Sequence, residues 1–145
     1  MLRHLAALAL LSQFSLPAAA FQLIHDNEAR LPASAGALNT RGITRGPGIK
    51  QIAPDPGSGT LKSPLNLKLS FEARGGAKID PASIRMTYLR ANPIDLSPRI
   101  KHGVSDQGIE LANAEVPPGD HEQQVTVQDS EGRKSSHVVK LTVVK

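Results

Sequence analysis

Cysteine is absent from all 145 residues, so the chain has no disulfide, no thiolate metal ligand and no cysteine nucleophile. The same absence leads us to expect no lipid anchor. Tryptophan is also absent, and three phenylalanines and one tyrosine are the only aromatic residues. A core must therefore consist mainly of leucine, isoleucine and valine. The scarcity of aromatic rings also argues against nucleic acid as a partner, because single strands stack their bases on such rings.

Motifs of known catalytic chemistry are missing as well. The sequence holds no H-E-x-x-H zinc motif and no phosphate-binding loop. Gly57-Ser58-Gly59 does not match the G-x-S-x-G pattern of hydrolases. We therefore expect no enzymatic activity, no catalytic residues and no cofactor.

The first twenty residues have the layout of a secretory signal peptide. Arg3 gives a positive start, Leu5–Leu11 is an unbroken apolar run, Pro17 ends it, and small residues precede a cleavage site after Ala20. A membrane anchor needs roughly 20 consecutive apolar residues, and this run is shorter. We predict a cleaved signal over residues 1–20, a periplasmic or secreted location and no stable membrane insertion after cleavage.

Residues 21–48 are predicted to form a flexible N-terminal linker. Their many small, polar, glycine and proline residues leave little surface to bury, so ordering the backbone would cost more than it returns. The segment does contain one apolar patch at Phe21, Leu23 and Ile24. This patch leaves an alternative open, in which Phe21–Arg30 forms a short helix or docks onto the domain.

Residues 49–145 are predicted to form a single all-β domain. Leu65, Leu67, Leu69 and Phe71 alternate with polar residues, which indicates a strand with one buried face. Turn signals recur about every 8–12 residues, which is typical of a sandwich or barrel. No long amphipathic helix interrupts them. Strands are expected at 49–53, 65–72, 84–88, 94–96, 99–102, 109–112, 121–129 and 136–144.

Three later strands also have apolar sets on one face, and the last two strands are expected to form a hairpin that turns at Asp129–Gly132. The predicted inward sets are Ile84, Met86 and Tyr88; Gln123, Val125 and Val127; and Val139, Leu141 and Val143.

Several of these stretches resemble bacterial immunoglobulin-like or cadherin-like modules. The resemblance implies an immunoglobulin-like antiparallel β-sandwich of about seven strands over residues 49–145. It implies little about function, because such modules serve as spacers, adhesins and binding domains. The residues that carry it are Ser63–Phe71, Ile79–Ile84, Pro118–His121, Val125–Asp129 and Gly132.

Charge is distributed unevenly along the chain. Residues 30–101 contain twelve lysines or arginines and four acids, whereas residues 102–145 contain four basic residues and seven acids. One interpretation is a basic surface that meets an anionic partner. The other is ordinary solubility charge, which we favour because no short window concentrates the basic residues.

Candidate metal ligands are scattered. His25, His102, His121 and His137 lack the close spacing of zinc or copper motifs. His121 follows a turn, where an imidazole is placed to bond a loop carbonyl. We therefore predict no metal-site residues, and a periplasmic copper-binding or calcium-binding carrier remains the alternative function.

Acidic residues near turns are the candidates for calcium. Asp120, Asp129 and Glu131 lie near turns but do not follow an EF-hand pattern. For Asp129 we expect a structural role, in which its carboxylate caps its own turn by accepting backbone N–H groups.

Taken together, the sequence predicts a non-catalytic exported binding or accessory module. Its expected partner is a protein or an envelope polymer, and its expected state is a monomer. Contact is expected through loops at one end of the sandwich or through an exposed edge strand. The loops Arg90–Lys101 and Asp129–Lys134 are the candidates, because they are polar, charged and predicted to be unnecessary for the core.

Overall fold

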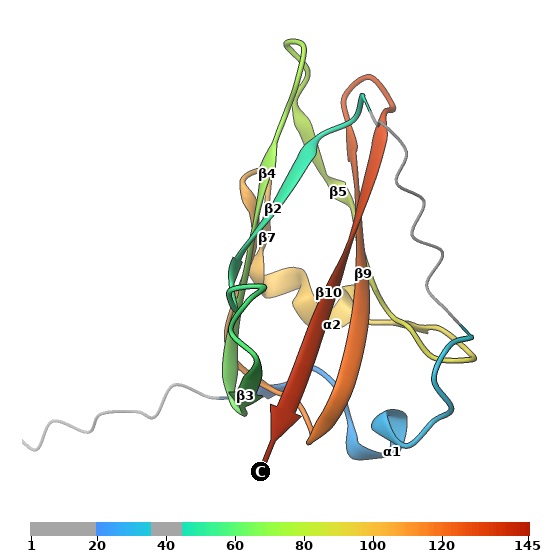
Figure 1. The fold of residues 1–145 in the computed structure, drawn as a ribbon. Coiled ribbons are helices and arrows are strands. Elements are labelled where there is room, and N and C mark those ends of the chain that lie inside the picture. Colours follow the sequence, from blue (N-terminus) through green and yellow to red (C-terminus); the bar gives the residue numbers. More distant parts are fainter. Residues whose placement is uncertain (1–19, 36–44) are drawn as a thin grey trace, which may run out of the picture.

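A computed structural model describes residues 20–35 and 45–145 of the chain. The predicted signal peptide, apart from Ala20, and residues 36–44 of the predicted linker lie outside the described residues. The described chain forms two five-stranded sheets that pack face to face as a β-sandwich (Figure 1). Within these residues, no helix has the length and apolar character needed to cross a membrane.

The first sheet has the order β1-β8-β4-β2, and β7 also pairs with β8. Strand β4 is antiparallel to both β2 and β8, whereas the short β1 runs parallel to β8. The strands of this sheet are β1 (Phe21–Gln22), β2 (Gly48–Ala53), β4 (Leu65–Glu72), β7 (Val104–Ser105) and β8 (Gly108–Glu115).

The second sheet has the order β3-β10-β9-β5-β6. The last two strands of the chain, β9 and β10, form the expected antiparallel hairpin, and β3 pairs in parallel with the end of β10. The prediction of a C-terminal hairpin is thus confirmed. The strands are β3 (Thr60–Lys62), β5 (Ile79–Tyr88), β6 (Ile94–Asp95), β9 (Gly119–Asp129) and β10 (Lys134–Val144).

The core lies between the two sheets and consists mainly of aliphatic side chains. In β4 the buried and exposed residues alternate, because successive side chains of a strand point to opposite faces. All of the predicted inward sets are buried, which confirms the predicted register of these strands. The side chains in question are Leu65, Leu67, Leu69, Phe71, Ile84, Met86, Tyr88, Gln123, Val125, Val127, Val139, Leu141 and Val143.

The N-terminal segment differs from the flexible linker that its composition predicts. Residues 21–35 dock onto the sandwich through β1 and through the short helix α1 (Asp26–Ala29). Leu23 and Ile24 are both 0 % exposed and belong to the core. Burying each such side chain stabilises the fold by about 1.5–3 kcal/mol, which offsets part of the entropy lost when the segment becomes ordered. We call residues 20–33 the N-terminal arm.

The segment between β6 and β7 corrects two expectations. A strand was expected at 99–102, but these residues belong to α2 (Ser97–Ile100) and the 3-10 helix η1 (Lys101–Gly103). Proline in the first turn of α2 favours a helix, because its fixed φ suits that position. The loop Arg90–Lys101 is also not free of the core, since Leu96 and Ile100 are almost fully buried.

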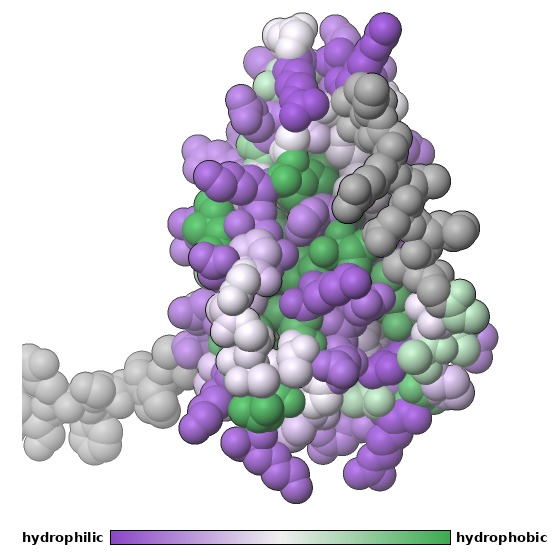
Figure 2. Space-filling view, in the orientation of Figure 1, coloured by the Kyte–Doolittle hydropathy of each residue, from purple (hydrophilic) through white to green (hydrophobic). Residues whose placement is uncertain are grey.

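The surface is mostly polar. Figure 2 shows hydrophilic side chains at both ends of the sandwich and apolar residues along the middle of the face between β2 and β10. Among the described residues, the exposed large apolar side chains are Leu31, Ile52 and Val144. They come from separate segments, which is ordinary for a folded surface.

Candidate functional site

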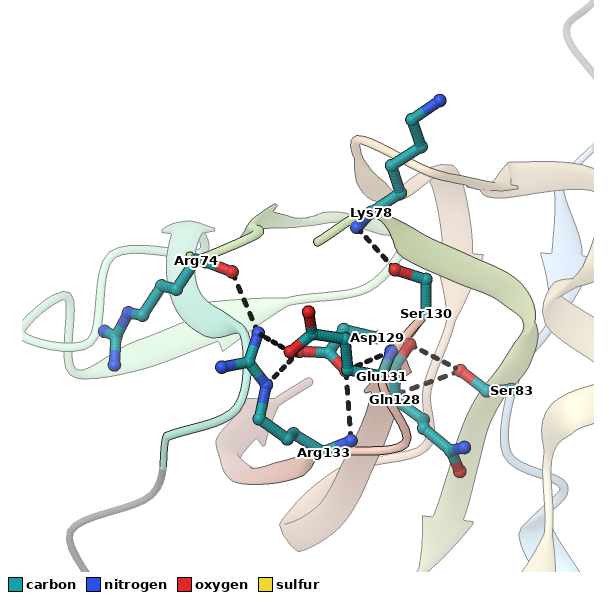
Figure 3. A network of polar contacts seen from close by, with 8 residues as sticks. All are labelled: Arg74, Lys78, Ser83, Gln128, Asp129, Ser130, Glu131 and Arg133. Carbon is teal, nitrogen blue, oxygen red and sulfur yellow. Dashed lines mark hydrogen bonds and ion pairs between the residues drawn. The ribbon is translucent and has the colours of Figure 1, made fainter. Parts of the chain in front are cut away.

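Two turns meet at one end of the sandwich, at the top of Figure 1, and the first of them crosses from one sheet to the other. One turn links β4 to β5, and the other links β9 to β10. The N–H of Ser130 donates to the carbonyl oxygen of Lys78 at 2.7 Å, and the N–H of Lys78 donates to Ser130 Oγ at 3.0 Å. Arg133 Nη2 donates to the carbonyl oxygen of Arg74 at 2.9 Å (Figure 3). We call residues 73–78 and 129–134 the basic loop end.

Asp129 holds the second turn in place. Its Oδ1 accepts the N–H groups of Glu131 at 2.9 Å and Arg133 at 3.0 Å, and its Oδ2 accepts Arg133 Nε at 2.8 Å. Burial favours the neutral acid, but the hydrogen bonds from Arg133 and Glu131 outweigh it and lower the pKa of Asp129. The prediction that Asp129 caps its own turn is confirmed, so this carboxylate is already engaged.

The basic loop end has more positive than negative charge. It contains four cations and two carboxylates, and Arg133 forms ion pairs with both carboxylates, those of Asp129 and Glu131. The side chains of Arg74 and Lys78 instead point away from the network in Figure 3 and have no partner among the described residues. Only their backbone groups hold the turns, so both side-chain charges are available to an anionic partner.

A cleft of about 690 Å³ opens beside the basic loop end. It lies between the adjoining ends of β4 and β5 on one side and the turn from β7 to β8 on the other. Apolar residues supply most of its lining, and one lysine, one acid and one amide stand among them. The lining consists of Phe71, Ala73, Ala77, Ile79 and Pro81, together with Lys78, Asp106 and Gln107.

A second polar cluster lies buried at the opposite end of β5. Tyr88 Oη donates to His121 Nδ1 at 2.8 Å, and His121 Nε2 donates to the carbonyl oxygen of Pro117 at 2.7 Å. Arg90 donates to Tyr88 Oη. Burial lowers the pKa of His121 and raises the pKa of Tyr88, so both are neutral near pH 7. The expected bond from His121 to a loop carbonyl is confirmed, and the cluster is structural.

The structure keeps the other candidate metal ligands apart. His102 packs edge-on against Phe21, His137 bonds Gln51 at 3.2 Å, and His25 precedes α1. Residues 20–35 and 45–145 contain no group of three histidine or acidic side chains that could hold a metal ion.

The third acidic candidate is also engaged. Asp120 Oδ1 accepts a hydrogen bond from Thr142 Oγ1 at 2.8 Å, across the β9–β10 ladder. With Asp129 and Glu131 bound to Arg133, each of the three calcium candidates has a partner within the protein.

Comparisons with family models, with curated proteins and with solved structures found no match to the chain.

The sequence predicted a contact loop in only one of the two segments of the basic loop end. It selected Asp129–Lys134 as a contact loop, and the structure places this loop beside residues 73–78, which it had treated only as a turn. The signal was weak, because Gly75 and Gly76 mark a turn without showing which other loop lies beside it. The other selected loop, Arg90–Lys101, contributes Leu96 and Ile100 to the core.

Proposed function

We propose that this protein is an exported, non-catalytic binding or accessory module that contacts an anionic partner, either a protein or an envelope polymer, through its basic loop end and the adjoining cleft. The observation that carries the proposal is the state of Arg74 and Lys78. Their backbones are fixed by the two linked turns, while their charged groups have no partner among the described residues, and Lys78 also lines the mainly apolar cleft. A rigid site loses little entropy on binding, which favours affinity.

The strand order supports an immunoglobulin-like arrangement as part of this proposal. One sheet follows the order β7-β8-β4-β2 and the other β3-β10-β9-β5-β6. Between β2 and β3 the chain changes sheets, pairing antiparallel with β4 and then parallel with β10. Such sandwiches commonly place their contact loops together at one end, as the two linked turns are placed here.

Export is the remaining part of the proposal, and it is supported by the signal-like order of residues 1–20. An exported protein meets envelope polymers and other exported proteins, many of which are anionic. The excess of positive charge at the basic loop end would attract such a partner and raise its association rate.

Site-specific photo-crosslinking in the producing cell tests this function. We expect a crosslinkable residue at Ala77, which lines the cleft, to capture a partner, and one at the exposed Lys62 of β3 to capture none. Arg74→Glu with Lys78→Glu should abolish capture from position 77, because it reverses both unpaired charges. The matched change Lys62→Glu should leave capture intact. Equal adducts from both positions, or adducts insensitive to the double reversal, would refute the proposal.

A further inference from the structure

A second hollow adjoins the cleft along β5, on the side away from the basic loop end. Its volume is about 310 Å³, and Pro81 lines both hollows. Ile84 and Val104 supply apolar lining, and Arg85 and Lys101 are the charged residues that line it. We call the two hollows together the β5 groove.

The shape of the β5 groove is fixed by a bulge in β5. The ladder with β9 is irregular between Asp80 and Arg85. Asp80 Oδ1 accepts the N–H of Ala82 at 3.0 Å, and Ser83 Oγ accepts the N–H of Gln128 at 2.9 Å, as Figure 3 shows for the second bond. Because a bulge bends a strand and redirects its side chains, the groove exists before any partner binds.

Arg85 is held in position over this groove. Its Nη1 donates to the carbonyl oxygens of Ala82 at 2.8 Å and Ile84 at 2.9 Å. The Nε and Nη2 donors of Arg85, and the ammonium group of Lys101, have no partner among the described residues. Arg85 contributes to lowering the pKa of Asp95, after the larger effect of the hydrogen bonds from Ser97, but Asp95 does not line the hollow. The second hollow therefore presents two cations and no carboxylate in its lining.

We propose that the β5 groove binds an extended acidic peptide segment of a partner protein, which makes the partner class of the proposed function specific and rests on that function. Acidic side chains pair with Arg85 and Lys101, since guanidinium and carboxylate groups form strong charge-assisted hydrogen bonds. Apolar side chains of the same peptide occupy the cleft near Ile79. From Ile79 to Arg85 the strand has seven residues, and at about 3.3 Å per residue an extended peptide of similar length fits along it.

The lining favours a peptide over an envelope glycan. An apolar wall leaves sugar hydroxyls without hydrogen-bond partners, which is costly. Stacking cannot compensate, because Phe71 is the one aromatic residue of the groove and only 8 % of it is exposed.

Selection from a random octapeptide display library on the intact mature chain tests the inference. We expect the enriched peptides to combine apolar residues in one half with Asp or Glu in the other. The strongest peptide, fluorescently labelled, should bind at least tenfold more weakly when its acids are replaced by Asn or Gln. Lys101→Glu and Arg85→Glu should each weaken binding about tenfold, whereas Lys50→Glu, at an exposed lysine of β2, should change it less than twofold.

Lys101→Glu keeps the test decisive, because Arg85 also bonds two carbonyl groups and its replacement can disturb β5. Enrichment of basic or purely apolar peptides would overturn the inference, and so would full peptide binding by the Lys101→Glu variant. Tight binding of an acidic oligosaccharide that Lys101→Glu abolishes would also overturn it. Crosslinking from Ala77 separates this result from the proposed function. If Arg74→Glu with Lys78→Glu abolishes capture while both groove variants retain it, the function stands and the peptide groove fails.

Discussion

Arg99 donates two hydrogen bonds to the carboxylate of Glu28, although 71 residues separate them in the chain. The bonds measure 2.7 Å from Nη1 to Oε2 and 2.5 Å from Nη2 to Oε1. Arg99 Nη1 also donates to the carbonyl oxygen of Leu23 at 3.0 Å. The hydrogen bond from Arg99 lowers the pKa of Glu28 to about 2. This ion pair fastens α1 to α2 and so holds the N-terminal arm against the sandwich.

A double-mutant cycle with Glu28→Gln and Arg99→Gln should give a coupling energy of about 1 kcal/mol, because the pair is partly shielded from water and doubly bonded. Urea unfolding of the four proteins measures it. The exposed pair Lys68 and Glu110, at 3.8 Å, is the control and should couple by less than about 0.5 kcal/mol. Equal coupling energies in the two cycles would show that the ion pair between Glu28 and Arg99 stabilises the fold no more than an exposed pair does.

The same pair predicts a dependence on pH. The folded-state pKa of Glu28 lies below its ordinary value of 4.5, so the pair stabilises the fold fully above that value and progressively less as the pH falls toward 2. Glu28→Gln should therefore reduce the loss of stability over this acidic range.

Leu23→Asp should destabilise the protein by about 3 kcal/mol or more, or prevent folding, because it buries an unpaired carboxylate in the core. Leu31→Asp makes the same chemical change at a side chain that is 40 % exposed, and it should alter stability by about 0.5 kcal/mol or less. Urea denaturation of both variants checks this. A Leu23→Asp protein as stable as the parent would mean that the arm is a linker after all.

Strand β4 and the N-terminal arm show which parts of the fold the sequence could and could not predict. Strand β4 was predictable because its apolar residues alternate over eight positions, a local pattern with one structural solution. Leu23 and Ile24 are adjacent apolar residues without a period, and their packing partners are distant in sequence. Composition alone therefore classified the arm as a linker, whereas long-range burial decided its structure.

At the basic loop end, too, local contacts were predictable from the sequence and long-range contacts were not. The cap by Asp129 was predictable because its partners lie within four residues. The contact between Arg133 and Arg74 spans 59 residues and depends on which turns the sandwich places together. No local pattern encodes that placement, and the same holds for the β5 groove.

Leu67→Asp tests the register of β4 directly. Leu67 is 0 % exposed and lies opposite Leu111 of β8, so a carboxylate there should abolish cooperative folding. Asn66→Asp, one residue earlier, places the same group on the exposed face and keeps the oxygen that accepts the N–H of Asn113. Its melting temperature should stay near that of the parent. If the effects of the two variants were exchanged, the strand would be shifted by one residue.

Adding copper, zinc or calcium should not raise the melting temperature of the protein. A ligand that binds only the folded state stabilises it in proportion to the logarithm of its concentration. The candidate ligands His102, His121 and His137 lie in separate contacts, with Phe21, Tyr88 and Gln51 respectively. A shift of several degrees with any one of these metals, reversed by a chelator, would revive the carrier function.

His121 should make the protein less stable as the pH falls below about 6.5. Its Nε2–H donates to Pro117, and its Nδ1 accepts from Tyr88, whose oxygen already accepts a hydrogen bond from Arg90. A second proton on the imidazole would leave the Tyr88 hydroxyl hydrogen without an acceptor and add charge beside Arg90. Burial lowers the folded-state pKa of His121, so below its ordinary value the unfolded chain binds a proton that the folded protein does not. Stability is therefore retained above pH 6.5 and lost as the pH drops toward the folded-state pKa.

Thermal unfolding between pH 7 and pH 5 measures this loss, a range above the titration of Glu28. Burial also lowers the pKa of His137, so both histidines contribute in the same direction. His121→Gln should cost about 1–3 kcal/mol at pH 7, because it removes buried hydrogen bonds, and should flatten the pH dependence. His137→Gln should flatten it further when combined with His121→Gln. A double variant that keeps the full slope of the parent would assign the pH dependence to other groups.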